Sequence, residues 1–242
     1  MKELWRLGIV LFRARKRNDF SRRSYYQAPF FAKPGEVGRL FAYAGFESGI
    51  EIDANFAIVD VETSGLQAEN SHIIEIAILQ ISRDGKQIKS FETLVRPPDD
   101  HVGRSDIHKI EQSHVLDAPR FSEITGDVLE ALSDCILVAH NAKFEEMFLS
   151  EEFKRAGITV PTIPAIDTMW LAQMGLDLSN YKLATVVESF GYKIQGAHTA
   201  YGDIEAVSKF LPELLESLPA LKYPGDLNTF PDLPTGARIK TR

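Results

Sequence analysis

One stretch of the sequence decides the fold: Phe56-Ala57-Ile58-Val59-Asp60-Val61-Glu62-Thr63-Ser64-Gly65. Its apolar run predicts a buried β-strand that ends in a turn at the glycine. Because side chains alternate along a strand, Asp60 and Glu62 point to the same face, with carboxylates within several Å of each other. At an effective dielectric constant of about 20 and a gap of about 5 Å, they repel by roughly 3 kcal/mol. A hard divalent cation, Mg²⁺ or Mn²⁺, is the natural partner for such a pair.

Length and composition are those of an ordinary folded domain. The 242 residues are 44% hydrophobic and 25% charged, which predicts one sizeable domain with extensions. The single cysteine, Cys135, excludes an internal disulfide and suits a reducing, cytoplasmic location. No segment reaches the roughly 20 apolar residues that a membrane span needs. The run from Leu4 to Phe12 is too short, and leads into too basic a segment, for a signal peptide.

Charge is distributed unevenly along the chain. The net charge is −7, but residues 1–25 hold eight Lys or Arg against Glu3 and Asp19, so this arm carries +6 and the remainder −13. The basic arm is either an electrostatic handle for phosphates or a solvated segment that binds nothing. Its amphipathic pattern also leaves contact with a membrane surface open. The negative charge of the body would be partly offset by bound metal.

The chain divides into three expected parts: an N-terminal basic extension at 1–53, a folded domain at 54–218, and a Pro/Gly-rich tail at 219–242 that is unstructured alone. Strands are expected at 55–61, 73–82, 87–95 and 135–140, with Asp84-Gly85 as a hairpin turn. Helices are expected at 105–115, 121–133, 142–156, 168–174, 183–190 and 200–217, with a linker at Pro161 and Pro164. This order predicts an α/β fold with a mixed sheet flanked by helices.

Two further positions carry candidate chemistry. Glu145 falls on the first turn of a helix that follows an apolar strand, where by itself it would simply complement the helix dipole. His198 precedes Asp203 at the start of the last helix, and a histidine there is commonly only a turn residue. Its unperturbed pKa near 6.5 nevertheless suits a proton acceptor beside a metal-held carboxylate.

Taken together, these motifs resemble the DEDDh 3′→5′ exonucleases of the ribonuclease H-like superfamily, which include the proofreading epsilon subunit of bacterial DNA polymerase III. The resemblance covers about residues 54–218 and follows the family's order and spacing. It rests on Asp-x-Glu-Thr-x-Gly at 60–65, Ile107-His108, Val-Ala-His-Asn-Ala-x-Phe at 138–144, and His-x-Ala-x-x-Asp at 198–203. It implies a ribonuclease H-like fold with a five-stranded mixed sheet.

The resemblance also implies a function. It is that of a two-metal phosphodiesterase that releases nucleoside 5′-monophosphates from single-stranded 3′ ends, in proofreading or DNA repair. DNA is the expected substrate, but the sequence does not separate it from RNA, because the contacts to a 2′-hydroxyl are not visible in the motifs. A polymerase or repair partner would dock through the termini. Two Mg²⁺ or Mn²⁺ ions would be held by Asp60, Glu62, Glu145 and Asp203, and His198 would take a proton from the attacking water. The residues that would bind the terminal nucleotide are Thr63, Leu66, His108, Asn141 and Phe144.

One departure from the family matters, because the family has Asp where this sequence has Glu145. The extra methylene moves the carboxylate outward by about 1.5 Å. In the family this carboxylate helps to bind the second metal, often through water, so the site either tolerates the change, or has weaker metal affinity, or favours Mn²⁺. Glu146 is a possible substitute, but it points about 100° away around the helix. The alternative function is therefore a catalytically weakened nucleic-acid-binding or polymerase-associated module.

Other polar residues match no catalytic motif. Asp167 is expected to cap the helix that follows it and not to bind metal. The histidines expected at the surface or in packing are His72, His101 and His114.

Overall fold

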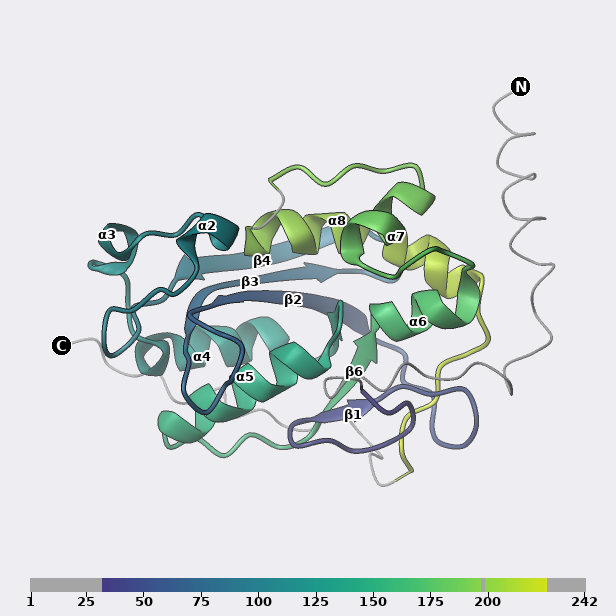
Figure 1. Ribbon diagram of the computed structural model, residues 1–242. Coiled ribbons are helices and arrows are strands. Elements are labelled where there is room, and N and C mark those ends of the chain that lie inside the picture. The colour runs from purple at the N-terminus through teal and green to yellow at the C-terminus, as the bar shows by residue number, and fades with distance from the viewer. Residues whose placement is uncertain (1–31, 197–198, 226–242) are drawn as a thin grey trace.

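The computed structural model describes residues 32–196 and 199–225, which form a six-stranded mixed sheet in the order β1-β6-β5-β2-β3-β4. The strands are β1 (Phe41–Tyr43), β2 (Asn55–Thr63), β3 (Ile73–Ile81), β4 (Gln87–Leu94), β5 (Cys135–Ala139) and β6 (Ile163–Asp167). Strands β1, β6, β5 and β2 are parallel neighbours, whereas β2, β3 and β4 form an antiparallel meander. The predicted mixed α/β fold is confirmed (Figure 1).

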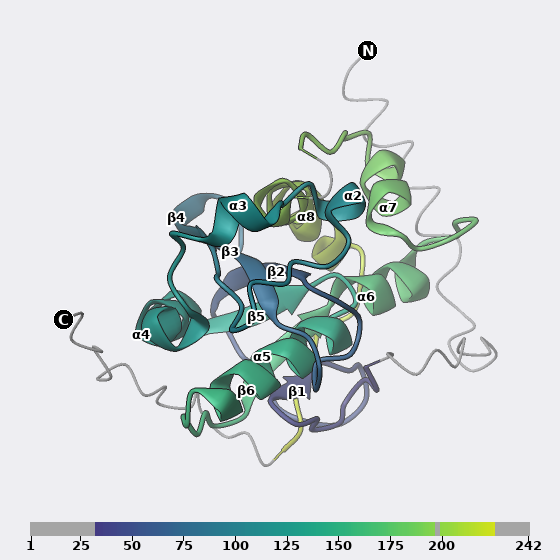
Figure 2. The same ribbon diagram turned by 60° about the vertical axis from the view of Figure 1, so that its left-hand side comes forward.

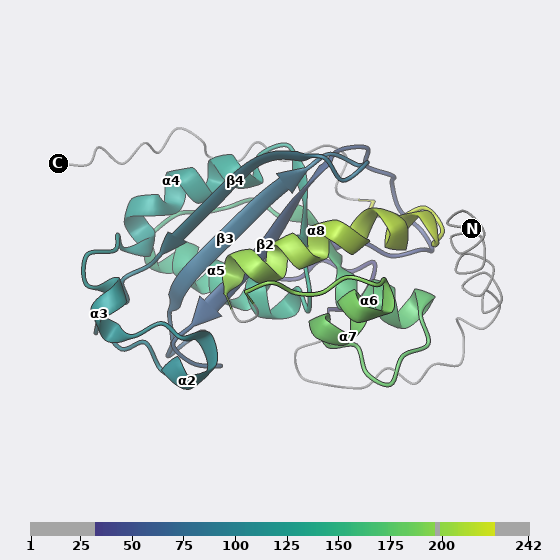
Figure 3. The same ribbon diagram turned by 90° about the horizontal axis from the view of Figure 1, so that it is seen from above.

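Helices cover both faces of the sheet (Figures 1 and 2). One apolar core lies under α4 (Phe121–Leu132) and α5 (Lys143–Arg155), and a second lies under α6 (Thr168–Gly175), α7 (Leu183–Ser189) and α8 (Ala200–Glu216). Seen from above, α8 runs along the β2–β3 pair, and α2 (Ser105–His108) and α3 (Gln112–Val115) lie beyond the end of β2 (Figure 3). Within the described residues no helix is long and apolar enough to cross a membrane.

Most of the predicted elements are present with ends shifted by one or two residues. The hairpin between β3 and β4 turns at Gly85, whose φ of +85° is a conformation that side chains rarely adopt. A single helix was expected at 105–115, but the structure has two short ones. The first ends at His108, because the next residue, Lys109, takes a left-handed φ of +62° that breaks the helix.

The prediction of a linker at Pro161 and Pro164 is wrong, because Pro164 lies within strand β6. Prolines usually argue against a strand, since they lack a backbone donor. Here the hydrogen bonds to the β1 side use the residues on either side of Pro164: Ile163 N–H donates to Leu40 O (3.0 Å), and Ala165 O accepts from Ala44 N–H (2.9 Å). The proline therefore removes no donor from this ladder.

Strand β1 and the start of the tail also depart from the expected pattern. Phe41 to Tyr43, within the predicted extension, are buried as the edge of the sheet. Bridges from Lys222 and Tyr223 to Gly45 and Ile50 fix the first residues of the predicted tail. Residues 32–225 thus extend beyond the core predicted for 54–218 at both ends, and the three-part division stays a prediction. The basic arm at 1–25, His198 and residues 226–242 lie outside the described residues.

Cys135 begins a central strand and is buried, 5% exposed, as a free thiol. The predicted absence of an internal disulfide rests on its being the one cysteine of the sequence.

Candidate active site at the carboxyl end of strand β2

Asp60 and Glu62 lie near the carboxyl end of β2 and share one face of the sheet. Phe56 and Ile58, at even positions before them, belong to the core under α8, so strand alternation places both carboxylates on the α8 side. Directly across the antiparallel ladder from Glu62 is Glu75 on β3. This end of the sheet therefore gathers three acidic side chains before any helix contributes one.

Two helices begin at the same end of the sheet. Strand β5 runs parallel to β2, and the helix after it, α5, carries Glu145 in its first turn. Helix α8 carries Asp203 in its first turn, and Thr199 caps that turn by accepting a hydrogen bond from Gly202 N–H (3.1 Å). Because parallel strands expose their carboxyl ends together, side chains from distant segments meet there. The structure thus brings Asp60, Glu62, Glu145 and Asp203 into one region.

The electrostatics of the cluster confirm that these carboxylates are neighbours. Burial, followed by the charges of Glu145, Asp203, Glu62 and Glu75, raises the pKa of Asp60 well above its usual range. The pKa of Glu62 is raised to about 8, first by burial and then by Glu75 and Asp203. Like charges that share a poorly solvated site favour protonation unless a cation offsets them.

Glu145 is the most deeply buried of the four predicted acids, at 3% exposed. Its Oε2 atom is buried without a hydrogen-bond partner among the described residues. Burial raises the pKa of Glu145 well above its usual range, and the charge of Asp167 adds to the rise, against a backbone hydrogen bond that lowers it. A buried carboxylate oxygen without a donor is costly, which marks this position as one that awaits a partner.

The donor set fits a divalent cation by its chemistry. It consists of hard carboxylate oxygens, with one buried oxygen left without a donor, and Mg²⁺ and Mn²⁺ prefer such ligands. However, the structure holds no group of three or more His, Cys, Asp or Glu side chains, within its described ranges, that is arranged to bind a metal ion. The carboxylates share a region without closing into a ligand shell, so metal binding here remains a proposal.

Two acidic neighbours of the cluster have structural roles. Glu146 turns away from it: its Oε1 accepts from Leu40 N–H (2.8 Å) and Phe41 N–H (3.0 Å), and its Oε2 accepts from Tyr43 O–H (2.6 Å). Glu146 therefore anchors β1 and is no substitute for Glu145. The Oδ1 atom of Asp167 accepts from the backbone N–H groups of Met169 and Trp170, which confirms the predicted cap of α6.

The residues predicted to bind the terminal nucleotide lie around the same end of the sheet. Thr63 is the last residue of β2, and its hydroxyl donates to Gly65 O (2.7 Å). Leu66 follows on the β2–β3 loop and is 74% exposed, which is unusual for leucine. Asn141, with φ of +76°, forms the turn into α5, where Phe144 packs against Phe148 with ring centroids 4.9 Å apart. Substrate contact by these four residues stays a prediction.

His108, the fifth residue predicted to bind the nucleotide, lies at the end of α2. It is buried, and its Nδ1 accepts a hydrogen bond from Ile110 N–H (3.1 Å). The proton is therefore on Nε2, which donates to Val102 O (3.0 Å), and burial lowers the pKa of the ring. Both ring nitrogens are used to hold the α2 loop together. The predicted part of His108 in lining the nucleotide pocket, together with Asn141 and Phe144, stays a prediction.

Sequence reasoning missed Glu75, which joins β3 to the start of α8. Its Oε2 accepts from Ala200 N–H (2.9 Å), three residues before Asp203. Burial raises the pKa of Glu75, against the hydrogen bond from Ala200, which lowers it. The available signal was a single acid inside the otherwise apolar run Ile73-Ile74-Glu75-Ile76. An acid in a fully buried strand needs a partner, and that partner here is a helix end 125 residues away.

A mixed sheet with helices on both faces, and acids gathered where its parallel strands end, is the arrangement expected from the resemblance to the DEDDh exonucleases. Escherichia coli exonuclease I in complex with a dT13 oligonucleotide shares this fold, with a TM-score of 0.59 over 67% of this chain and 41% of its own, at 14% identity. The model of the RNase T family, described as exonuclease, matches residues 57–211. The chain belongs to this exonuclease family, as its resemblance to the DEDDh enzymes predicts.

Curated relatives are larger proteins. A PolC-type DNA polymerase III from Caldanaerobacter subterraneus is 35% identical over 177 residues, covering 71% of this chain and 12% of the relative. The 3′-5′ exonuclease DinG of Staphylococcus epidermidis is 28% identical over 174 residues, covering 69% of this chain and 19% of the relative. This chain therefore corresponds to a small part of each.

Proposed function

We propose that this protein is a metal-dependent 3′→5′ exonuclease that hydrolyses single-stranded nucleic acid to nucleoside 5′-monophosphates. The observation that carries the proposal is the convergence of Asp60, Glu62, Glu145 and Asp203 at one end of the sheet. These residues come from three segments far apart in the sequence, in a chain of an exonuclease family. Acids gathered this closely repel one another, and burial and their mutual charges raise the pKa values of Asp60 and Glu62, which favours a catalytic role for the cluster.

DNA is the preferred substrate of the proposal. The relatives named above include PolC-type DNA polymerase III, and the structural neighbour is described in complex with a dT13 oligonucleotide. A single strand would approach over the exposed Leu66, beside the carboxylates. Discrimination against RNA depends on contacts to the 2′-hydroxyl, so it is tested directly below.

The four acids would hold two Mg²⁺ or Mn²⁺ ions. Bound there, the ions would supply charge stabilisation to the attacking and leaving oxygens of an in-line displacement. His198 would accept a proton from the attacking water. It immediately precedes Thr199, the cap of α8, so the same helix start would place both His198 and Asp203. Thr63 and Leu66 would position the terminal nucleotide, with Asn141 and Phe144 beside it.

A digestion with matched oligonucleotides tests this function. Single-stranded DNA and RNA of the same sequence, labelled at the 5′ end, are incubated with Mg²⁺, with Mn²⁺ or with a chelator. Stepwise shortening from the 3′ end that requires the metal, and is faster on DNA, is the expected result. Tight binding without cleavage would instead support the nucleic-acid-binding module, and shortening from the 5′ end would contradict the proposal.

Asp203→Ala is the catalytic control for this assay. Because it removes a proposed ligand, we expect cleavage to fall by at least about 10³-fold, equivalent to about 4 kcal/mol in the barrier. Lys209→Ala, further along the same helix, removes only a surface ion pair with Glu205 and should leave cleavage unchanged. Undiminished turnover in Asp203→Ala would refute the assignment of the site.

A polymerase or repair partner bound through the termini is part of the same proposal. Its support is that the matched region makes up only 12% of the PolC-type polymerase and 19% of DinG, so in these relatives it is joined to much further sequence. A pull-down with purified replication proteins, with and without residues 226–242, tests it. Retained binding after the deletion would exclude the tail as the docking segment.

A further inference from the structure

The loop between β2 and β3, residues 64–72, joins the two strands that carry Asp60, Glu62 and Glu75. It also carries Leu66, three residues after the end of β2, whose side chain is 74% exposed. A long surface loop usually moves, yet an apolar group that grips a nucleotide needs a fixed position. The question is what fixes this loop.

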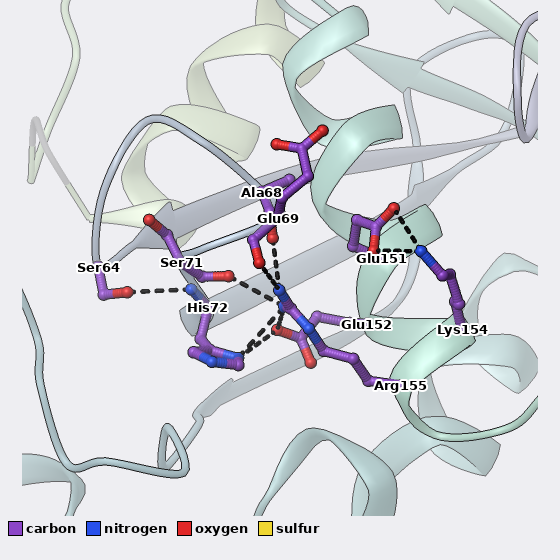
Figure 4. Close-up of polar contacts among 9 residues, drawn as sticks. All are labelled: Ser64, Ala68, Glu69, Ser71, His72, Glu151, Glu152, Lys154 and Arg155. Atoms are coloured by element: carbon purple, nitrogen blue, oxygen red, sulfur yellow. Dashed lines mark hydrogen bonds and ion pairs between the residues drawn. The ribbon is translucent and has the colours of Figure 1, made fainter.

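Arg155, the last residue of α5, holds the loop from below (Figure 4). Its Nη2 donates to Ala68 O (2.6 Å) and Glu69 O (3.1 Å), and its Nη1 donates to Ser71 O (2.9 Å). Nη1 also donates to Glu152 Oε1 (2.8 Å), one turn earlier on α5. One guanidinium group thus donates hydrogen bonds to three backbone carbonyls within residues 68–71. The planar arrangement of its five donors allows this, whereas a lysine ammonium group would not.

A second set of contacts closes the base of the loop. His72 Nδ1 lies 2.9 Å from Glu152 Oε1, and the backbone N–H of His72 donates to Ser64 Oγ (2.9 Å). Ser64 N–H in turn donates to His72 O (2.9 Å). Glu152 is buried and the Arg155 side chain is 26% exposed, so these charge-assisted hydrogen bonds are partly shielded from solvent. The backbone at Gly103 also packs closely against the start of the loop, since a Cβ atom at Gly103 would overlap Ser64 O.

We infer that Arg155 is a positioning residue for the nucleotide-binding loop: by clamping residues 68–71 to α5, it fixes Leu66 relative to the acids. Helix α5 carries Glu145 in its first turn and Arg155 in its last, so one rigid element sets both the acid and the loop. The inference rests on the proposed function for its kinetic consequence, and on geometry alone for the ordering of the loop.

The test uses Arg155→Met, which keeps much of the length of the side chain and removes its donors. Lys154→Met is the matched control, because Lys154 is adjacent, is 74% exposed and contacts only Glu151 among the contacts shown in Figure 4. Leu66→Ala and the double variant Leu66→Ala/Arg155→Met complete a cycle. Cleavage of a short single-stranded DNA is measured as kcat and KM, and amide hydrogen exchange is measured over residues 63–72.

The expected kinetic result is a change in binding that depends on Leu66. Arg155→Met should raise KM about tenfold while kcat changes by less than about threefold. In the Leu66→Ala background the same substitution should raise KM by less than about twofold, because the side chain it positions is gone. An equal rise in both backgrounds, or a fall in kcat with KM unchanged, would overturn the inference.

Hydrogen exchange separates a failure of the clamp from a failure of the proposed function. Faster exchange of the loop amides in Arg155→Met, with the sheet strands and the Lys154→Met control unchanged, is the expected result. Unchanged exchange in the loop would refute the clamp even if the enzyme is active. If the wild-type protein does not cleave DNA, the proposed function fails while the exchange result still decides whether Arg155 orders the loop.

Discussion

Glu145 and Glu146 are adjacent in the first turn of α5 and both are buried, yet their surroundings are opposite. Glu146 accepts hydrogen bonds from two backbone N–H groups and one hydroxyl and pairs with Lys143, and these contacts outweigh burial and lower its pKa. Glu145 has an oxygen without a partner and a raised pKa. The comparison teaches that burial alone does not identify a functional acid, because two adjacent buried carboxylates differ in whether donors satisfy both of their oxygens.

The largest expected effect comes from Glu146→Leu. It leaves three donors without an acceptor, namely the backbone N–H groups of Leu40 and Phe41 and the Tyr43 hydroxyl. Since an orphaned buried donor costs about 1–3 kcal/mol, the free energy of unfolding should fall by about 4 kcal/mol. Chemical denaturation followed by circular dichroism measures the change. A loss below about 1 kcal/mol would show that β1 is not held by this residue.

His140 extends the comparison to a buried base with partners. Its Nε2 donates to Tyr181 O (2.9 Å), its Nδ1 contacts Thr168 Oγ1 (2.9 Å), and burial lowers its pKa to about 4 from an ordinary 6.5. Between these values the unfolded chain binds the proton and the folded chain does not. The contribution of His140 to the free energy of unfolding is therefore fully present above pH 6.5. As the pH falls toward 4 this contribution is lost, which lowers the free energy of unfolding by up to about 3 kcal/mol.

Unfolding of the wild type and of His140→Gln over pH 4 to 7.5 isolates this contribution, because the other titrating groups are common to both. The wild type should be the more stable at pH 7.5, and its advantage should shrink as the pH falls. An advantage that is the same at every pH would contradict the prediction.

Replacement by leucine should lower the free energy of unfolding at position 146 but raise it at position 145. Glu145→Leu replaces a buried carboxyl group whose Oε2 atom has no donor among the described residues, so with a chelator present the free energy of unfolding should rise by about 1 kcal/mol. Denaturation under the conditions used for Glu146→Leu measures it. Cleavage activity should be lost in the same variant. A large destabilisation would show that Glu145 is a structural anchor like its neighbour.

The smallest expected effect is that of Glu145→Asp, which restores the acid that the family has at this position. Cleavage supported by Mg²⁺ should be kept or raised, because the shorter side chain matches the family's arrangement. Rates with Mg²⁺ and with Mn²⁺ are compared with those of the wild type. A loss of more than about tenfold, or 1.4 kcal/mol in the barrier, would show that the site is built around glutamate.

Local patterns predicted the centre of the molecule well. Alternation along β2 placed Asp60 and Glu62 on one face, and the Asp84-Gly85 turn gave the hairpin. The helical spacing of about 100° per residue predicted that Glu146 points away from Glu145. These predictions succeed because each depends on contacts within one element or between neighbours in sequence.

The errors occur where distant segments decide the outcome. Strand β6 contains Pro164, and β1 is only three residues long, so neither has a local pattern typical of a strand. Their pairing with each other, and the anchor of β1 on Glu146, supply the stability that the local sequence lacks. Glu75 was missed for the same reason, because its partner at Ala200 cannot be seen from the strand alone.

The single buried thiol makes this protein easy to label. Cys135 is 5% exposed in a central strand, and the sequence has no second cysteine, so maleimide dyes would find no accessible native target in the folded state. A Leu66→Cys variant would take one fluorophore on the exposed β2–β3 loop without removal of the native cysteine. Its emission would report in real time when an oligonucleotide arrives and departs.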